Sequence, residues 1–138
     1  ELGATHTISP ASGDVFKQVF AIVGDDGVDC AIEAVGIPAT WNMCQDIVKP
    51  GGHIAVVGVH GQSVDFKLEK LWIKNLAITT GLVNANTTEM LMKAISSSSV
   101  DYTKMLTHRF KFSELEKAYD VFKHAAENQA MKVVLEAD

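Results

Sequence analysis

The sequence predicts an α/β fold with a doubly wound parallel sheet. Residues 28–36 and 53–59 are two short runs of small and branched apolar residues, and an amphipathic segment from Pro38 to Val48 lies between them. The second run is apolar almost throughout, which is typical of a strand that is covered on both faces. Short links join the three segments, and such strand–helix–strand units belong to parallel sheets with right-handed crossovers.

The helices of the N-terminal half are predicted from apolar residues that recur every three or four positions. Segment 14–23 has this spacing and ends at the Gly-Asp-Asp-Gly turn 24–27. Pro38 is typical of a helix start. The sequence Lys-Pro-Gly-Gly at 49–52 is expected to break this helix sharply before the strand at 53–59.

The C-terminal half continues the alternation of strands and helices. Residues 76–83 indicate a further strand, 88–96 a helix that ends in four serines, and 132–135 a short final strand. His108 is expected in a turn beside Arg109.

A capping box predicts one more helix. Ser113 and Glu116 have the S-x-x-E spacing, in which each side chain bonds the other's free backbone N–H. The apolar stripe that follows is expected to be buried and consists of Leu115, Ala118, Tyr119, Phe122 and Ala126.

Composition excludes several classes of function. The chain has 138 residues, a length typical of one domain, with 47% hydrophobic and 21% charged residues and a net charge of −5. Arg109 is the only arginine, so a basic face for nucleic acid is not expected. A membrane span and a signal peptide are not expected either, and a reducing cytoplasm is the default compartment. Because the chain does not start with methionine, we expect it to be a piece of a longer protein.

The chemically versatile side chains give few catalytic signals. Cys30 and Cys44 lie among apolar neighbours and are expected to be buried, and they lack the spacing of a zinc site. His60 follows a strand, where a ligand could reach it, but a solvated loop histidine is the simpler expectation. Asp29 and Glu33 share one strand face, and we interpret both as surface or sheet-end charges.

Glycine follows three successive predicted strands, at 34–36, 57–61 and 81–84. Ligands of parallel sheets bind beyond the carboxyl ends of the strands, and glycine lets the backbone approach them closely. This arrangement favours a nucleotide-binding crevice. A G-x-G-x-x-G phosphate loop is absent, so either the chain does not bind a dinucleotide or the first strand–helix–strand unit lies before Glu1.

Several motifs in fixed order resemble the medium-chain zinc-dependent alcohol dehydrogenases, and together they cover nearly the whole chain. They are Leu2-Gly3-Ala4-Thr5, Gly27-Val28-Asp29-Cys30-Ala31-Ile32-Glu33-Ala34-Val35-Gly36, Val48-Lys49-Pro50-Gly51-Gly52, Val56-Val57-Gly58-Val59, Ile78-Thr79-Thr80-Gly81-Leu82, Leu106-Thr107-His108-Arg109-Phe110, Glu116-Lys117-Ala118-Tyr119 and Met131-Lys132-Val133-Val134-Leu135.

The resemblance implies the C-terminal part of a cofactor-binding domain, a partial Rossmann-like sheet that lacks its first two strands. It assigns the third strand to residues 6–8 and three later strands to the segments described above. The family's GroES-like catalytic domain, its zinc ligands, its glycine fingerprint and its acidic ribose contact would all precede Glu1. Zinc would therefore belong to the full-length parent only, and the isolated chain is expected to be inactive and to bind no stoichiometric zinc.

The resemblance also implies contacts to NAD or NADP. Val35 and Gly36 resemble the segment beside the adenosine ribose. Val57, Gly58 and Val59 resemble the backbone run that faces the nicotinamide.

Three more cofactor contacts follow from the same resemblance. Leu82 and Asn84 resemble the matching positions on the next strand exit. Lys132 lies near the place where relatives have a basic residue that faces the cofactor's phosphates.

The function implied for the parent is hydride transfer between a small alcohol or carbonyl substrate and NAD(P). A zinc-independent quinone reductase fragment and a non-catalytic nucleotide-binding or oligomerisation module remain alternatives. Family members pair through the edge at 64–80, and the strand at 28–35 would lose its natural neighbour. A homo-oligomer is therefore expected.

Overall fold

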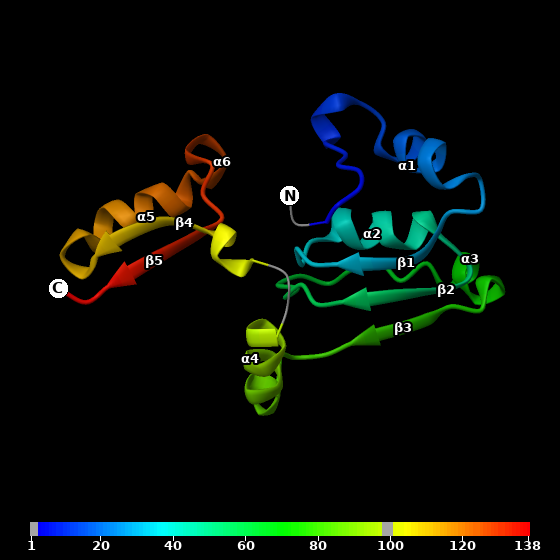
Figure 1. Ribbon diagram of the computed structural model, residues 1–138. Helices are drawn as coiled ribbons and strands as arrows, with labels where there is room; N and C mark the ends of the chain where they lie inside the picture. The colour runs from blue at the N-terminus through cyan, green and yellow to red at the C-terminus, as the bar shows by residue number, and fades with distance from the viewer. Residues whose placement is uncertain (1–2, 98–100) are drawn as a thin grey trace. The chain divides into compact units, whose positions relative to one another are not determined.

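The computed structural model describes residues 3–97 and 101–138 (Figure 1). The chain divides into two compact units, Glu1–Asn84 and Ala85–Asp138. Each unit holds parallel strands that are joined through helices, which confirms the predicted α/β class and a partial sheet.

The first unit contains a parallel sheet of three strands in the order β1 (Val28–Glu33), β2 (Val48–Val56) and β3 (Ala77–Thr80). Helix α2 (Pro38–Ile47) connects the first two strands, as predicted. Because all three strands are parallel, their carboxyl ends meet at one edge of the sheet. β1 and β3 are the two edge strands of this sheet.

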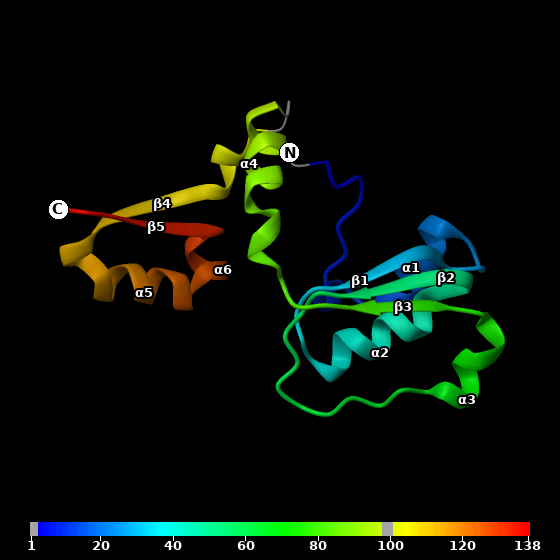
Figure 2. The same cartoon turned by 90° about the horizontal axis from the view of Figure 1, so that it is seen from below.

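Helix α2 and the short helix α3 (Leu68–Leu71) lie on the same side of this sheet (Figure 2). The core lies between α2 and the sheet, and its buried members are Ala31, Trp41, Cys44, Val48 and Ile54. Helix α1 (Val15–Val23) matches its prediction closely. It begins at Asp14, whose carboxylate accepts the backbone N–H groups of Phe16 and Lys17.

Four expectations for this unit were wrong in detail. β2 begins at Val48 and not at residue 53: the helix does end at Ile47, before the Lys-Pro-Gly-Gly sequence, but residues 49–52 form a bulge within the strand. β1 ends at Glu33, so 34–36 is not strand. Residues 6–8 form no strand. Cys30 is exposed, because it lies on the sheet face away from α2.

The second unit pairs β4 (Leu106–Lys111) with β5 (Lys132–Glu136), and helix α5 (Leu115–Lys123) connects them. This is a second strand–helix–strand unit with parallel strands. Helix α4 (Thr88–Ser97) precedes it, and the short helix α6 (Ala125–Asn128) follows α5.

Sequence reasoning missed β4 and misplaced the cap of α5. His108 lies in β4 and not in a turn. Ser113 lies inside the 3₁₀ turn Phe112–Glu114 and not at a helix N-cap, and its hydroxyl donates to Asp138 at 2.9 Å. Glu114 takes the capping role instead, since its carboxylate accepts the N–H of Lys111.

The predicted apolar stripe of α5 is buried only in part. Ala118 is buried, whereas Tyr119 and Phe122 are 66% and 59% exposed. In the serine tract, Ser98 and Ser99 lie outside the described residues. The remaining elements are 3₁₀ turns at Pro10–Ser12, Trp72–Lys74, Ala85–Thr87, Tyr102–Met105 and Phe112–Glu114. Among the described residues, no helix has the length and apolar character needed to cross a membrane.

Candidate functional site

Glu33 ends β1 and is the centre of the most elaborate polar cluster at the carboxyl edge of the sheet. Its side chain is fully buried. Oε1 accepts the backbone N–H of Val35 at 3.0 Å, the N–H of Gly36 at 2.8 Å and the hydroxyl of Thr40 at 2.6 Å. Oε2 lies 3.1 Å from Nε2 of His60. One carboxylate thus joins the exit of β1, the first turn of α2 and the exit of β2.

The backbone of Glu33 strengthens the same junction. Its carbonyl accepts the N–H of Val57 at 2.8 Å and that of Gly58 at 3.1 Å. Gly36 adopts φ +89°, and a Cβ there would collide with the carbonyl of Val59. A Cβ on Gly58 would collide with Oε2 of Glu33 and the amide nitrogen of Gly36. Both glycines are therefore required by the close approach of the two strand exits.

The electrostatics of Glu33 follow from this geometry. Burial by itself raises the pKa of a carboxyl group, because the charged form loses its hydration. The hydrogen bonds from Thr40, Gly36, Val35 and His60 outweigh burial and lower the pKa of Glu33 to about 2. Glu33 is therefore ionised at neutral pH, and Nε2 of His60 must carry the proton that it shares with the carboxylate.

This depressed pKa predicts acid sensitivity. The contribution of Glu33 to the free energy of unfolding is fully present above its ordinary pKa of 4.5 and is lost as the pH falls towards about 2. Urea unfolding at pH 6 and at pH 3 should show the loss. In Glu33→Gln, which cannot titrate at this position, the fall in stability between these pH values should be smaller. An equal fall in both proteins would contradict this assignment.

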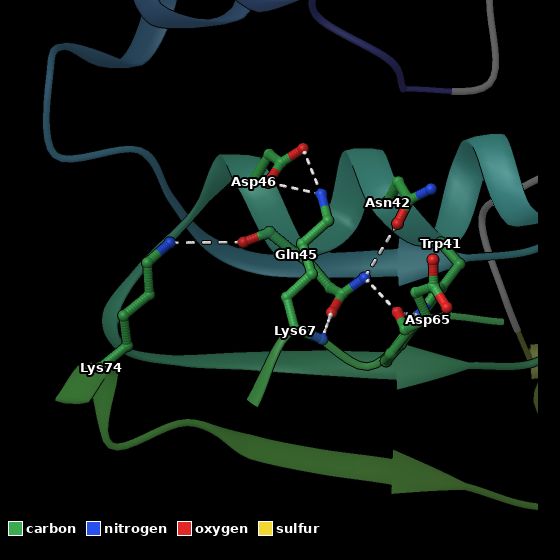
Figure 3. Close-up of polar contacts among 7 residues, drawn as sticks. All are labelled: Trp41, Asn42, Gln45, Asp46, Asp65, Lys67 and Lys74. Carbon is green, nitrogen blue, oxygen red and sulfur yellow. Dashed lines mark hydrogen bonds and ion pairs between the residues drawn. The ribbon is translucent and has the colours of Figure 1, made fainter. Parts of the chain in front are cut away.

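The segment that follows β2 is also fixed at its far end, by α2 (Figure 3). The indole N–H of Trp41 donates to the carbonyl of Asp65 at 2.8 Å, and the side-chain amide of Gln45 donates to the same carbonyl at 3.0 Å. The N–H of Lys67 donates to Oε1 of Gln45 at 3.0 Å. Gln45 is 1% exposed, so these bonds are shielded from water. Residues 57–67 are thus held to Glu33 at one end and to α2 at the other.

Lys74 adds a cap at the end of α2. Its ammonium group donates to the carbonyls of Gln45 at 3.3 Å and Val48 at 2.8 Å. A cation near the last carbonyls of a helix satisfies their free acceptors and the negative end of the helix dipole. The buried face of α2 that carries Gln45 is therefore held in place.

The structure brings together most of the residues predicted to contact a dinucleotide. Val35 and Gly36 lie against the run Val57–Val59 at the joined exits of β1 and β2. Val57 and Val59 are 61% and 85% exposed, so this edge presents backbone and apolar side chains to solvent. Leu82 and Asn84 follow the carboxyl end of β3, at the same edge, and Leu82 is 90% exposed.

Lys132 lies in the second unit, as the first residue of β5. There it lines an open cavity of about 290 Å³ together with Tyr119, Phe122 and Met131. Its backbone carbonyl accepts the hydroxyl of Thr107 at 3.2 Å.

Sequence reasoning missed the two side chains that organise the site. Glu33 is buried and is not a surface charge, and His60 is half-buried and is not solvated. They are 27 positions apart, so no local spacing connects them. The available signal was an acidic residue at the last position of a mostly apolar strand, two residues before Val35 and three before Gly36. Asp29, by contrast, is exposed as expected.

Metal-binding side chains do not converge in the part of the chain that the structure describes. Within residues 3–97 and 101–138, no group of three His, Cys, Asp or Glu side chains is placed to hold a metal ion. Glu33 and His60 are a pair, and the glutamate is already saturated by protein donors.

Comparison with known proteins identifies similar chains. The profile of the family described as zinc-binding dehydrogenase matches residues 1–97. An alcohol dehydrogenase of Cupriavidus necator is 29% identical over 126 residues, which are 88% of this chain and 34% of that protein. The chain therefore spans about a third of that relative.

Solved structures show the same likeness. A zinc-dependent alcohol dehydrogenase 2 from Streptococcus pneumonia, in its apo form, superposes with a TM-score of 0.88 at 48% identity, covering 99% of this chain and 39% of that one. A zinc-binding dehydrogenase from Sinorhizobium meliloti, described as bound to NADP, has the same fold with a TM-score of 0.82 at 24% identity, covering 96% of this chain and 39% of that one.

Proposed function

Because the chain belongs to the zinc-binding dehydrogenase family, we propose that it forms the cofactor-binding part of an oxidoreductase. The complete enzyme would transfer hydride between an alcohol and NAD(P), giving an aldehyde or a ketone. The observation that carries this proposal is the joined exit of β1 and β2, where Glu33 fixes two glycine-containing loops at the carboxyl edge of a parallel sheet. Nucleotide cofactors of parallel sheets bind at this edge.

The residues present fit contacts to both halves of a dinucleotide. Gly36 and Gly58 allow the two strand exits to approach closely. The N–H groups of Val57 and Gly58 already donate to the carbonyl of Glu33, so the backbone carbonyls of the run Val57–Val59 would be the groups that accept the N–H of a carboxamide. Val35 and Gly36 would lie beside the adenosine ribose. Leu82 and Asn84 would extend the contact surface. Bound NAD(P)+ would supply the hydride acceptor, and the residues of this edge would orient it.

Lys132 would contribute a positive charge towards the cofactor's phosphates in the complete enzyme. A lysine acts on phosphate as a compact point charge. The resemblance assigns zinc to the full-length parent, and the described residues offer no set of three metal ligands. We therefore assign this chain to cofactor orientation and not to activation of the alcohol oxygen.

Isolated, the chain should bind NAD+ or NADP+ weakly, with a Kd above roughly 100 μM, because the sequence holds no glycine-rich loop for the pyrophosphate. Titration calorimetry measures this affinity. In amide NMR spectra the Gly36 and Gly58 signals should shift on addition of NAD+, whereas Gly24 and Gly51, which precede β1 and interrupt β2, serve as internal controls. Low-micromolar affinity would instead favour a complete nucleotide-binding module.

We also propose that the chain self-associates. β1 and β3 are edge strands of an apolar parallel sheet, and such edges are templates for pairing with a second chain. Phe66, whose ring stacks on Trp41 of α2, and Leu68, the first residue of α3, lie in the segment at 64–80 and are 48% and 56% exposed. The double variant Phe66→Glu and Leu68→Glu should therefore shift a dimer towards monomer in light scattering at tens of micromolar protein, whereas Phe112→Glu, in the second unit, should not. A well-folded wild-type monomer at that concentration would refute self-association.

A further inference from the structure

His60 is the side chain that joins the segment after β2 to the carboxylate at the end of β1. Its imidazole is 18% exposed, and Nε2 lies 3.1 Å from Oε2 of Glu33. The neutral ring with its proton on Nε2 has a lone pair on Nδ1. That nitrogen is buried and finds no hydrogen-bond partner among the described residues.

The partnerless nitrogen indicates what holds the ring in place. A buried polar atom without a partner is costly, so the position must be favoured by another contact of the same ring. The bond from Nε2 to the ionised carboxylate is that contact, because hydrogen bonds to a charged group are stronger than neutral ones. The ring is therefore held through Glu33.

Glu33 distributes its partners unequally between its two oxygens. Oε1 accepts the backbone N–H groups of Val35 and Gly36, which follow β1, and the hydroxyl of Thr40 in α2. Oε2 accepts the N–H of Nε2 of His60, which follows β2. His60 is thus the side-chain link by which the carboxylate restrains the segment that begins with Val57–Val59.

We propose that His60 is a positioning residue for the dinucleotide, which acts through Glu33 to hold the Val57–Val59 backbone against Val35 and Gly36. This inference rests on the proposed function, since it takes the two strand exits as the cofactor site. Gln45 holds the far end of the same segment through Asp65 and Lys67 (Figure 3). The carbonyl of Glu33 accepts the N–H groups of Val57 and Gly58, so loss of His60 removes only the side-chain link at the near end.

The test is an NMR titration of the 138-residue chain with NAD+, which follows the amides of Gly36 and Gly58. His60→Ala should raise the Kd about 3- to 10-fold, because one charge-assisted hydrogen bond that orders the site is lost. His60→Gln should stay within about 2-fold of wild type, since its amide can donate to Oε2 in place of the ring. His53→Ala, at an exposed histidine of β2, is the matched control and should bind like wild type.

Two further readouts separate positioning from general destabilisation. The ring ¹⁵N shifts of wild-type His60 should show the proton on Nε2. The amide of Lys67, bonded to Gln45, should keep its shift in His60→Ala, because the anchor at α2 remains. If His60→Ala unfolds instead, restored binding in His60→Gln supports the proposal, and loss of binding there overturns it.

The outcomes distinguish this inference from the proposed function. Wild-type binding with shifts at Gly36 and Gly58, together with equal affinity in His60→Ala, overturns the inference and leaves the function standing. Two other results also overturn it: an equal loss of NAD+ affinity in His60→Ala and His60→Gln, or a ring proton on Nδ1 of wild-type His60. If the amide signals of Gly36 and Gly58 do not shift in the wild-type chain at millimolar NAD+, both the proposed function and the inference are overturned.

Discussion

Replacing Glu33 by alanine should lower the free energy of unfolding by about 3 kcal/mol, since it strips a buried hydrogen-bond network of its acceptor. The variant leaves the N–H groups of Val35 and Gly36, the hydroxyl of Thr40 and Nε2 of His60 without their common partner. It also opens a cavity at a position where the side chain is fully buried. Urea unfolding followed by circular dichroism measures the loss.

Two control variants show whether the loss comes from this network. Glu33→Gln keeps the volume and one acceptor oxygen for Val35, Gly36 and Thr40, so it should lose only about 1 kcal/mol at neutral pH. Asp29→Ala removes an exposed carboxylate from the same strand and should leave stability close to that of wild type. If Glu33→Ala were no less stable than Asp29→Ala, Glu33 would not be the centre of the junction.

Local patterns predicted the elements whose residues act through their immediate neighbours. Segment 14–23 became α1, and Pro38 begins α2, because apolar spacing and helix caps operate within a few residues. Their limits were harder to predict where a distant group intervened. Residues 34–36 and 57–59 look like strand, yet the Glu33 carboxylate and carbonyl take the N–H groups there, which ends both strands early.

The sequence predicted where the candidate site lies, but not which side chains hold it together. The strand exits with Gly36 and Gly58 were identified from the rule for parallel sheets. The pair of Glu33 and His60 was not, because a buried carboxylate needs partners that only the folded chain brings together. Ser113 is the opposite case, a local sequence motif that the folded chain does not use. Its spacing to Glu116 fits a capping box, but Ser113 lies inside the 3₁₀ turn Phe112–Glu114, before α5 begins, and its hydroxyl donates to Asp138.

Gly58 provides the sharpest test of the close approach between the strand exits. In Gly58→Ala the new Cβ would collide with Oε2 of Glu33 and with the amide nitrogen of Gly36, and it would lie 2.8 Å from the amide nitrogen of Val35. Two of these three atoms are backbone, so they cannot move aside as the end of a flexible side chain could. Relieving the collision would break the bonds that join β1 to the segment after β2.

We therefore expect Gly58→Ala to lower the free energy of unfolding by about 3 kcal/mol, the upper range for overpacking in a close-packed site. Gly61→Ala is the matched control, because a Cβ there meets nothing within 4 Å. It should stay within about 0.5 kcal/mol of wild type, as exposed substitutions usually do. Urea unfolding of both variants measures the difference. The amide chemical shifts of Val35 and Gly36 should also change from their wild-type values in Gly58→Ala. Equal stability of the two alanine variants would mean that the strand exits do not approach as closely as the geometry of Glu33 requires.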